Sequence, residues 1–407
     1  MPKIVSIKSI DNQGNETEYI SIAEAAYEEG CDESTIRKVI NKSSRTAKGK
    51  KWITAVQEEE AENTPLREID TELDKLGIDI KDVRQVWAKQ MKNGSYRYSI
   101  SVSEQDKFDE ELLLKKIEQS IKLHTTPAEY DVKAESNSSI LVYTADKHIG
   151  AKTKNNSLYE NEYNEEVFED RMFRLLERLI DLSDTFGTFK DLYFLDLGDP
   201  LDGYNKQTTR GGHSLPQNMT NEEAFDTYFR VHKKFFDSLV EYEVAENIHF
   251  KAVTNDNHSG SFGYTAQRAL EIYLNTAYNK ITTTLSNKFI THFKVGNHTF
   301  IVTHGKDSED RAKGLPLVLD EKTKNFVSDY IDYHNLNSPQ GYVHLIKGDL
   351  HQSSSQLTGK FRYRNTLSLY GSSAWIQNNF GNQTVAGVSI DIVDREKNEV
   401  FETNLIY

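Results

Sequence analysis

The sequence predicts an α/β protein with a small N-terminal helical unit. From residue 136 onward, short apolar runs of strand length alternate with long amphipathic stretches of helical period. Strands that are apolar along their whole length are typical of sheets that are covered by helices. Before residue 57 the pattern differs, because a pair of short strands is followed by two short helical segments. We therefore expect an α/β core with largely buried strands behind a separate N-terminal unit.

The predicted strands of the core are five apolar runs: 139–145, 192–197, 248–254, 299–303 and 342–346. Helices are expected between most of them, at 164–186 and 220–242. The second of these helices begins with Thr220 and Glu223, the spacing of a capping box. The C-terminal stretch 361–407 alternates polar and apolar residues, with a turn at 395–398, and is predicted to add antiparallel strands that close a second sheet.

Composition narrows the class of protein. The chain has 407 residues, enough for two or three domains, and a net charge of −14, so the whole molecule would repel nucleic acid at long range. A single cysteine excludes an internal disulfide framework and favours a reducing cytoplasm. No apolar run approaches the length of a membrane span, and the N-terminus lacks the apolar core of a signal peptide. We expect a cytoplasmic protein without a membrane partner.

Three segments are predicted: 1–56, 57–135 and 136–407. The first is a candidate DNA-binding domain, and the second begins with an acidic linker at 57–79. The remainder of the second segment is predicted to be a small connecting α+β element. In it, a helical segment precedes an alternating strand within 82–103, with a turn at Asn93-Gly94, and an amphipathic helix follows at 109–124.

The N-terminal segment has the pattern of a helix-turn-helix. Ser21 and Glu24 form a capping box, Gly30 ends that helix, and a second helix is expected at 34–41. The second helix and the residues after it are rich in cations, which suits phosphate contacts. The candidate DNA-binding residues are Arg37, Lys38, Lys42, Arg45, Lys48, Lys50 and Lys51. The segment resembles the helix-turn-helix modules of phage homing endonucleases; the alternative is a solvated helical face.

Each predicted strand of the core is followed by side chains that can bind metal ions. The five strands end in Asp146-Lys147-His148, Gly198-Asp199-Pro200-Leu201-Asp202, Asn255-Asp256-Asn257-His258, His304-Gly305 and Gly348-Asp349-Leu350-His351. In open α/β proteins, sites form at the carboxyl ends of the strands. In an extended Asp-x-His tripeptide both side chains lie on one face and can share a cation. Mixed oxygen and nitrogen ligands suit Mn, Fe or Zn.

This order of motifs resembles that of the calcineurin-like metallophosphoesterases across about 140–390. The family pattern is D-x-H, G-D-x-x-D, G-N-H-D/E, H-G and G-H-x-H. The resemblance implies a four-layer αββα sandwich with two divalent metal ions, Mn first, with Mg, Fe or Zn as alternatives. It implies Asp146, His148 and His351 as ligands of the first metal, Asn257 and His304 as ligands of the second, and Asp199 as the bridge. It further implies that His258 acts near the leaving oxygen and that Asp202 orients its imidazole.

The sequence departs from the family pattern at two motifs. Asp256 stands where the family has glycine and Ser259 where it has an acid, while Asp349 stands where it usually has histidine. A carboxylate can replace an imidazole as a ligand of a hard or borderline ion. Asp349 therefore either completes the second metal site or faces solvent and leaves that metal loosely held.

The resemblance implies a metal-dependent phosphoesterase in which a metal-bridging hydroxide attacks phosphorus in line. The N-terminal segment favours DNA as the partner, hence a phage-type DNA nuclease of the host cytoplasm. The alternatives are a phosphomonoesterase or cyclic-nucleotide phosphodiesterase, and a DNA-binding protein with an impaired metal site. In the loop 203–217, Lys206, Arg210 and His213 are candidate phosphate contacts, unless the loop is simply a mobile surface segment.

Overall fold

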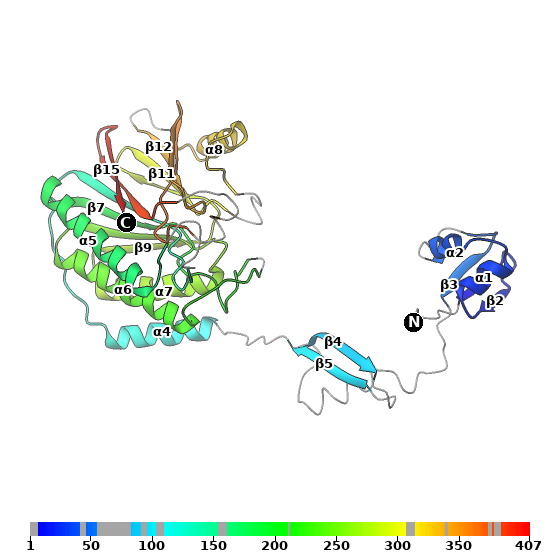
Figure 1. Ribbon diagram of the computed structural model, residues 1–407. Coiled ribbons are helices and arrows are strands. Elements are labelled where there is room, and N and C mark those ends of the chain that lie inside the picture. Colours follow the sequence, from blue (N-terminus) through cyan, green and yellow to red (C-terminus); the bar gives the residue numbers. More distant parts are fainter. Residues whose placement is uncertain are drawn as a thin grey trace. The chain divides into compact units, whose positions relative to one another are not determined.

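The computed structural model divides into two compact units, 1–108 and 109–407. Each is coherent in itself and is described separately (Figure 1). The structure describes residues 7–40, 46–54, 83–90, 96–102, 110–153, 161–210, 212–306, 314–337, 341–372, 377 and 384–407. The predicted acidic linker 57–79 and the Asn93-Gly94 turn lie outside these residues.

The N-terminal unit contains a three-stranded antiparallel sheet and two short helices. Its strands are β1 (Ile7–Ile10), β2 (Glu16–Tyr19) and β3 (Lys51–Thr54), in the order β2-β1-β3. The helices are α1 (Ile22–Glu28) and α2 (Glu33–Ile40). Of the predicted capping box, the Ser21 half is present, since Ser21 Oγ accepts from Glu24 N, whereas the Glu24 carboxylate accepts from Ile20 N and not from Ser21 N. Buried side chains from both helices and all three strands form one core, which includes Ile36 and Trp52.

The segment that the sequence predicted as a helix and a strand is a hairpin of two strands. β4 (Val83–Gln90) pairs antiparallel with β5 (Tyr96–Val102). The helical prediction for the first half was wrong, because 83–90 is a strand whose backbone pairs with β5. The helix α4 (Glu110–His124) then begins the larger unit, which starts before residue 136.

The larger unit is built on two sheets. The six-stranded sheet has the order β16-β15-β6-β7-β8-β9, with β6, β7, β8 and β9 parallel to one another. The five-stranded sheet has the order β10-β11-β12-β14-β13. The strands are β6 (Ser138–Thr144), β7 (Phe189–Asp196), β8 (Ala245–Val253), β9 (Ile281–Ser286), β10 (Thr291–Val295), β11 (His298–Thr303), β12 (Val343–Lys347), β13 (Ser354–Leu357), β14 (Phe361–Asn365), β15 (Gly387–Asp394) and β16 (Val400–Ile406).

The five strands predicted for the core are present as β6, β7, β8, β11 and β12. The C-terminal strands differ from the prediction in their partners. β13 and β14 extend the second sheet, but β15 pairs antiparallel with β6, so β15 and β16 complete the first sheet instead. The aromatic composition of the C-terminal stretch favours a core role for Phe361, Tyr363, Tyr370 and Trp375; the first three are buried, while Trp375 lies outside the described residues.

Helices cover the outer face of each sheet. α5 (Glu165–Phe186), α6 (Asn221–Glu241) and α7 (Gly260–Ala277) pack on the six-stranded sheet, and α8 (Glu321–Tyr333) packs on the five-stranded sheet (Figure 1). Between the sheets lies a third apolar core, to which Tyr143 and Leu195 contribute from one side and Phe300 and Ile346 from the other. These are the four layers, helix-sheet-sheet-helix, that the sequence analysis predicted. No helix in the described part of the chain is long and apolar enough to cross a membrane.

Candidate metal centre

The candidate ligands lie in turns directly after the strands. Asp146 and His148 follow β6, and backbone hydrogen bonds join this turn to the one after β7: Asp146 N donates to Gly198 O at 3.2 Å and His148 N to Asp199 O at 3.0 Å. The turn after β12 joins the same assembly, because Gly348 N donates to His304 O at 3.0 Å. The pairing of the strands therefore continues through the ligand-bearing turns.

These turns are not extended, which corrects the prediction that Asp146 and His148 share one face of an extended segment. Their φ angles are 50° and 44°, in the left-handed region that non-glycine residues rarely adopt. Asp199, Asp349 and His351 have φ of 49°, 73° and 53°. Such strain persists only where the surrounding structure imposes it, and it concentrates at functional sites.

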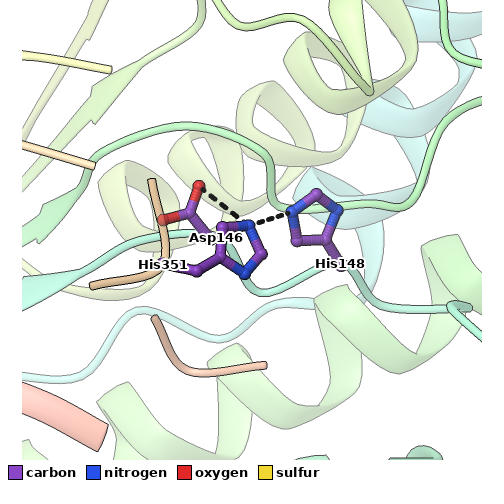
Figure 2. Close-up of side chains that lie close together, drawn as sticks. All are labelled: Asp146, His148 and His351. Carbon is purple, nitrogen blue, oxygen red and sulfur yellow. Dashed lines mark hydrogen bonds and ion pairs between the residues drawn. The ribbon is translucent and has the colours of Figure 1, made fainter. Parts of the chain in front are cut away.

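The first group of ligands is Asp146, His148 and His351 (Figure 2). Nδ1 of His351 lies 2.7 Å from Gly371 O, and Nδ1 of His148 lies 3.0 Å from Asp202 Oδ1. A carbonyl or a carboxylate oxygen only accepts, so both histidines carry their proton on Nδ1. Their Nε2 atoms then face each other as acceptors at 3.2 Å, with Asp146 Oδ1 3.8 Å from that of His351.

The pKa values of these histidines strengthen the case for a cation. Burial lowers the pKa of His148, with His258 adding to the effect, and burial likewise lowers that of His351. Both imidazoles are therefore neutral near pH 7, and no proton is available to lie between their Nε2 atoms. A cation there would turn a repulsive contact into two bonds, which is the arrangement of metal-bound histidines whose other nitrogen is hydrogen-bonded.

The second group centres on Asp199 and His304. His304 donates from Nδ1 to Leu197 O at 2.9 Å, so its Nε2 faces three oxygens: Asn257 Oδ1 at 2.9 Å, Asp199 Oδ2 at 3.2 Å and Asp349 Oδ1 at 3.8 Å. Asp199 Oδ2 also lies 3.8 Å from His148 Nε2 in the first group. Asp199 therefore stands between the two groups, the place expected of a bridging ligand.

Asp146 also contacts both groups, since it clusters with Asp199 and His304 as well as with the first group. Its carboxylate is fully buried, and Oδ2 has no hydrogen-bond partner among the described residues. Burial raises the pKa of Asp146 to about 6, and Asp199 adds to this. A buried carboxylate oxygen without a donor is costly unless a cation binds it.

The donor set fits divalent metal ions. Ligand atoms at about 2.1 Å from a metal in tetrahedral or octahedral geometry lie roughly 3.0–3.4 Å from one another. Three pairs of candidate ligand atoms lie 2.9–3.2 Å apart and three further pairs lie 3.8 Å apart. The ligand atoms of Asp146, His148 and His351 all lie within 4.8 Å of one another, as do those of Asp146, Asp199 and His304. Imidazole, carboxylate and amide oxygen suit Mn, Fe or Zn. If the ligand atoms that now lie 3.8 Å apart moved closer by a few tenths of an ångström, they would reach the spacing of tetrahedral or octahedral ligands.

Asp349 points into the site. Its side chain is 9% exposed, its Oδ1 faces His304, and its backbone N donates to Asp146 Oδ1 at 3.2 Å. This position matches the first of the two alternatives left open by the sequence, in which Asp349 completes the second metal site. The carboxylate thus lies where a ligand of a second metal ion would be.

Asp202 and His258 lie beside the first group. Asp202 Oδ1 accepts from His148 Nδ1 and lies 3.4 Å from His258 Nδ1, at ion-pair distance. The His258 side chain is 22% exposed, whereas that of His148 is 3% exposed, so His258 is the accessible member of the pair. Its backbone N donates to Asp199 Oδ1 at 2.9 Å, which ties it to the bridging carboxylate.

Carboxylates dominate the pKa values of the two other histidines. Burial opposes the charged form of His304, but the charge of Asp199 outweighs it and raises the pKa to about 10. For His258, burial is likewise outweighed by Asp199 and Asp202, and the pKa rises to about 9. Near pH 7 His258 is thus protonated and able to donate a proton.

One positioning residue of the site was noticed in the sequence only as a departure from a motif. Asp256 is buried, and its carboxylate accepts from Asp199 N, Ser259 N, Ser259 Oγ and Gly260 N at 2.8–3.2 Å. It thereby caps α7, where Ser259 makes no side-chain cap, and holds the backbone of Asp199. An aspartate just before a helix is a recognised cap signal, which could have indicated this role.

The predicted phosphate contacts are only partly near the centre. Arg210 donates to Asn255 Oδ1 at 3.0 Å and to Lys306 O at 3.3 Å, so it joins two ligand-bearing turns. Lys206 and His213 have exposed side chains, and their backbone groups hydrogen-bond within the loop and to Gln217. The structure thus brings Arg210 to the site but gives the other two no contact with it.

The predicted DNA-binding cations have different surroundings. Lys38, Lys48 and Lys51 are exposed, and Arg37 is an exposed partner of Glu33. Lys50 bonds Glu29 at 2.6 Å and thus stabilises the N-terminal unit, which makes it a poor phosphate contact. Lys42 and Arg45 lie outside the described residues.

Comparison with known proteins gives remote structural matches. No protein-family model and no curated protein matches the sequence. Among solved structures, Vps29 from Entamoeba histolytica with Zn²⁺ aligns at 12% identity over 66% of this chain and 98% of its own, with a TM-score of 0.30. An archaeal phosphodiesterase aligns at 12% identity over 65% and 99%, also at 0.30. A putative 5′-nucleotidase from Staphylococcus aureus aligns at 11% identity over 66% and 54%, at 0.27.

Proposed function

We propose that this protein is a metal-dependent phosphodiester hydrolase that acts on DNA. The observation that carries the proposal is that potential metal-ligand atoms, which can only accept hydrogen bonds, face one another with no hydrogen-bond donor between them. The Nε2 atoms of His148 and His351 face each other at 3.2 Å, beside a buried carboxylate oxygen of Asp146 that has no partner in the described part of the chain. A second group of nitrogen and oxygen ligand atoms surrounds His304, and Asp199 joins the two groups.

The residues of the chain have distinct tasks in this hydrolysis. When bound, two divalent cations supply activated water and neutralise charge on the phosphoryl oxygens. Asp202 holds both His148 and His258, so the accessible imidazole keeps a defined orientation. His258, protonated near pH 7, donates its proton to the leaving oxygen of the ester, the general-acid role. An impaired site is disfavoured, because every candidate ligand faces the centre.

The choice of DNA as substrate is supported by the exposed cations of α2 and of the segment after it. The features described for the larger unit do not select DNA over other phosphodiesters. The proposal that DNA is the substrate therefore rests on the N-terminal unit. Arg37, Lys38, Lys48 and Lys51 remain accessible to phosphates, although the whole chain carries a net charge of −14. On a protein with a net negative charge, exposed cations in one unit favour DNA binding at that unit over long-range attraction of DNA to the whole molecule.

The activity is tested with purified protein that has been stripped with EDTA and reloaded with Mn²⁺, Mg²⁺ or Zn²⁺. Labelled single- and double-stranded DNA, bis(p-nitrophenyl) phosphate and p-nitrophenyl phosphate serve as substrates. We expect metal-dependent cleavage of DNA and of the diester, abolished in Asp199→Asn and retained in the control Asp184→Asn, which changes an exposed aspartate of α5. Hydrolysis of the monoester alone would refute the diesterase proposal.

DNA targeting is tested in the full chain by changing Arg37, Lys38, Lys48 and Lys51 together to alanine. We expect weaker DNA binding and a shallower dependence on salt, by about 0.9 in the logarithmic slope for each DNA phosphate that the variant no longer neutralises. A matched control changes the exposed Lys322 and Lys324 of α8. Equal affinity and slope in the two variants would remove the N-terminal unit from DNA recognition.

A further inference from the structure

Beside the metal centre lies an open, polar pocket of ≈ 700 Å³. Its wall is formed by Arg210 from the loop after β7, by Asn255 and Asp256 from the turn after β8, and by the first turns of α7, including Tyr264 and Arg268. The size falls within the range of small-molecule sites. Because Asp256 and Asn255 directly precede Asn257 and His258, the pocket adjoins the candidate catalytic residues.

Among the charged side chains that line the pocket, Arg268, Glu271 and Asp256 have partners that satisfy their charge, whereas Arg210 has only neutral partners in the part of the chain that the structure describes. Arg268 pairs with Glu271, and that carboxylate also accepts from Thr283 at 3.0 Å. Asp256 accepts four hydrogen bonds, as described above. Arg210, by contrast, is held by two neutral acceptors, Asn255 Oδ1 and Lys306 O, and no carboxylate among the described residues forms an ion pair with it.

The position of Arg210 is set by the metal centre. Its neighbour Thr209 bonds the carbonyl of His258 twice, from N at 2.9 Å and from Oγ1 at 3.0 Å. Lys306 lies two residues after His304, and Asn255 lies two residues before Asn257. The guanidinium therefore has a defined place relative to the candidate ligands. It has five N–H donors in total, so donors remain free for an anion after the two contacts with the protein.

We propose that this pocket binds the nucleotide next to the cleaved ester, with Arg210 pairing with the phosphate of that nucleotide. The inference rests on the proposed phosphodiesterase function and specifies its substrate as a nucleotide chain that carries a second phosphate. A guanidinium that is fixed but not neutralised suits bidentate pairing with a phosphate. The aromatic ring of Tyr264 and the polar wall provide room for the nucleoside beside it.

Binding is measured first without metal, so that the result does not depend on turnover. Calorimetry in EDTA compares thymidine 5′-monophosphate with thymidine and with inorganic phosphate. We expect the nucleotide to bind more tightly than either, and Arg210→Ala to weaken it about 10–100-fold. Arg210→Lys keeps the positive charge but loses the forked guanidinium, so its affinity for the nucleotide should lie between those of wild type and Arg210→Ala. The control Arg178→Ala on α5 should bind the nucleotide as tightly as wild type.

One further variant tests the pocket separately from the charge of Arg210. Ser261→Trp adds bulk at the pocket wall without removing Arg210, so nucleotide affinity should fall while affinity for inorganic phosphate is kept. Equal affinity for phosphate and for the nucleotide in wild type would overturn the pocket assignment. Unchanged nucleotide affinity in both Arg210 variants, with thermal unfolding like that of wild type, would overturn the role of Arg210.

Turnover is then measured with metal-loaded protein on the dinucleotides TpT, pTpT and TpTp. A terminal phosphate should raise kcat/KM, and Arg210→Ala should remove most of that gain, whereas Arg178→Ala should keep it. If no ester is cleaved but the nucleotide still binds through Arg210 in EDTA, the proposed function fails and the pocket stands. If bis(p-nitrophenyl) phosphate is cleaved but a terminal phosphate brings no gain, the pocket inference fails and the proposed function stands.

Discussion

Metal binding at the second group of ligands should release a proton from His304. A metal ion needs the neutral imidazole, whereas the carboxylates around it raise the pKa of His304 to about 10. Near pH 7 only about one molecule in 10³ has this imidazole neutral. The affinity for the second ion at pH 7 should therefore lie about 10³-fold below its limit at high pH, or ~4 kcal/mol. The first group should differ, because the pKa values of His148 and His351 are lowered.

Competition titrations of Mn²⁺ against a chromophoric chelator measure this effect between pH 6.5 and 9. Affinity for the second ion should rise about tenfold per pH unit, while affinity for the first should be nearly flat above pH 7. Calorimetry in two buffers of different ionisation enthalpy should count about one proton released by the second ion. His304→Gln should abolish that release. A second-ion affinity that stays constant from pH 7 to 9 would refute the reasoning.

The same histidine links the stability of the EDTA-treated protein to pH. Because the pKa of His304 is raised on folding, its proton stabilises the folded state fully below about pH 6.5, the ordinary histidine value. This contribution is lost as the pH rises towards about 10. The Tm in EDTA should fall over this window by more in wild type than in His304→Gln. Parallel Tm curves for the two proteins would contradict the assignment.

Substitutions at three positions, His258, Asp349 and Gly198, test the other roles. His258→Ala should keep both metal ions and lose about 10²–10⁴-fold in activity; unchanged turnover would remove its acid role. Asp349→Ala should lose one metal ion and Asp349→His should regain it, whereas two tightly held ions in the alanine variant would show that Asp349 is no ligand. Gly198→Ala places Cβ 2.7 Å from His304 Nδ1 at a φ of +97°, so it should lose the second ion, while Gly359→Ala, with nothing within 4 Å, should behave as wild type.

The strands and the residues at their ends could be predicted because the apolar runs stop abruptly at polar residues. A buried strand such as β7 requires an unbroken apolar face, and Gly198 and Asp199, which follow it after the buried Leu197, are free of that requirement. Position in the sequence therefore located the ligands before their spatial arrangement was known. The positions of the candidate ligands in the sequence do not show which of them share a metal ion. That assignment was implied by the resemblance to the calcineurin-like metallophosphoesterases.

Strand partners and turn conformations could not be predicted from the sequence. Alternation identified β15 as a strand, but its pairing with β6 is a long-range contact that alternation does not specify. The 82–90 segment shows the same limit, because its mixture of charged and apolar residues suits a helix until β5 pairs with it. The left-handed turns at Asp146 and His148 have no local signal either, since neither residue is glycine.

The strands that lead into the site are anchored in apolar cores. Strands β6, β7, β11 and β12 are anchored in cores between and outside the sheets, and their hydrogen bonding continues into the ligand turns. The strained conformations are thus imposed by the fold, unlike those of zinc fingers, whose folding depends on the ion. Removal of metal should therefore leave the helix and sheet content unchanged. Added metal should raise Tm only by mass action, in proportion to the logarithm of its concentration above Kd.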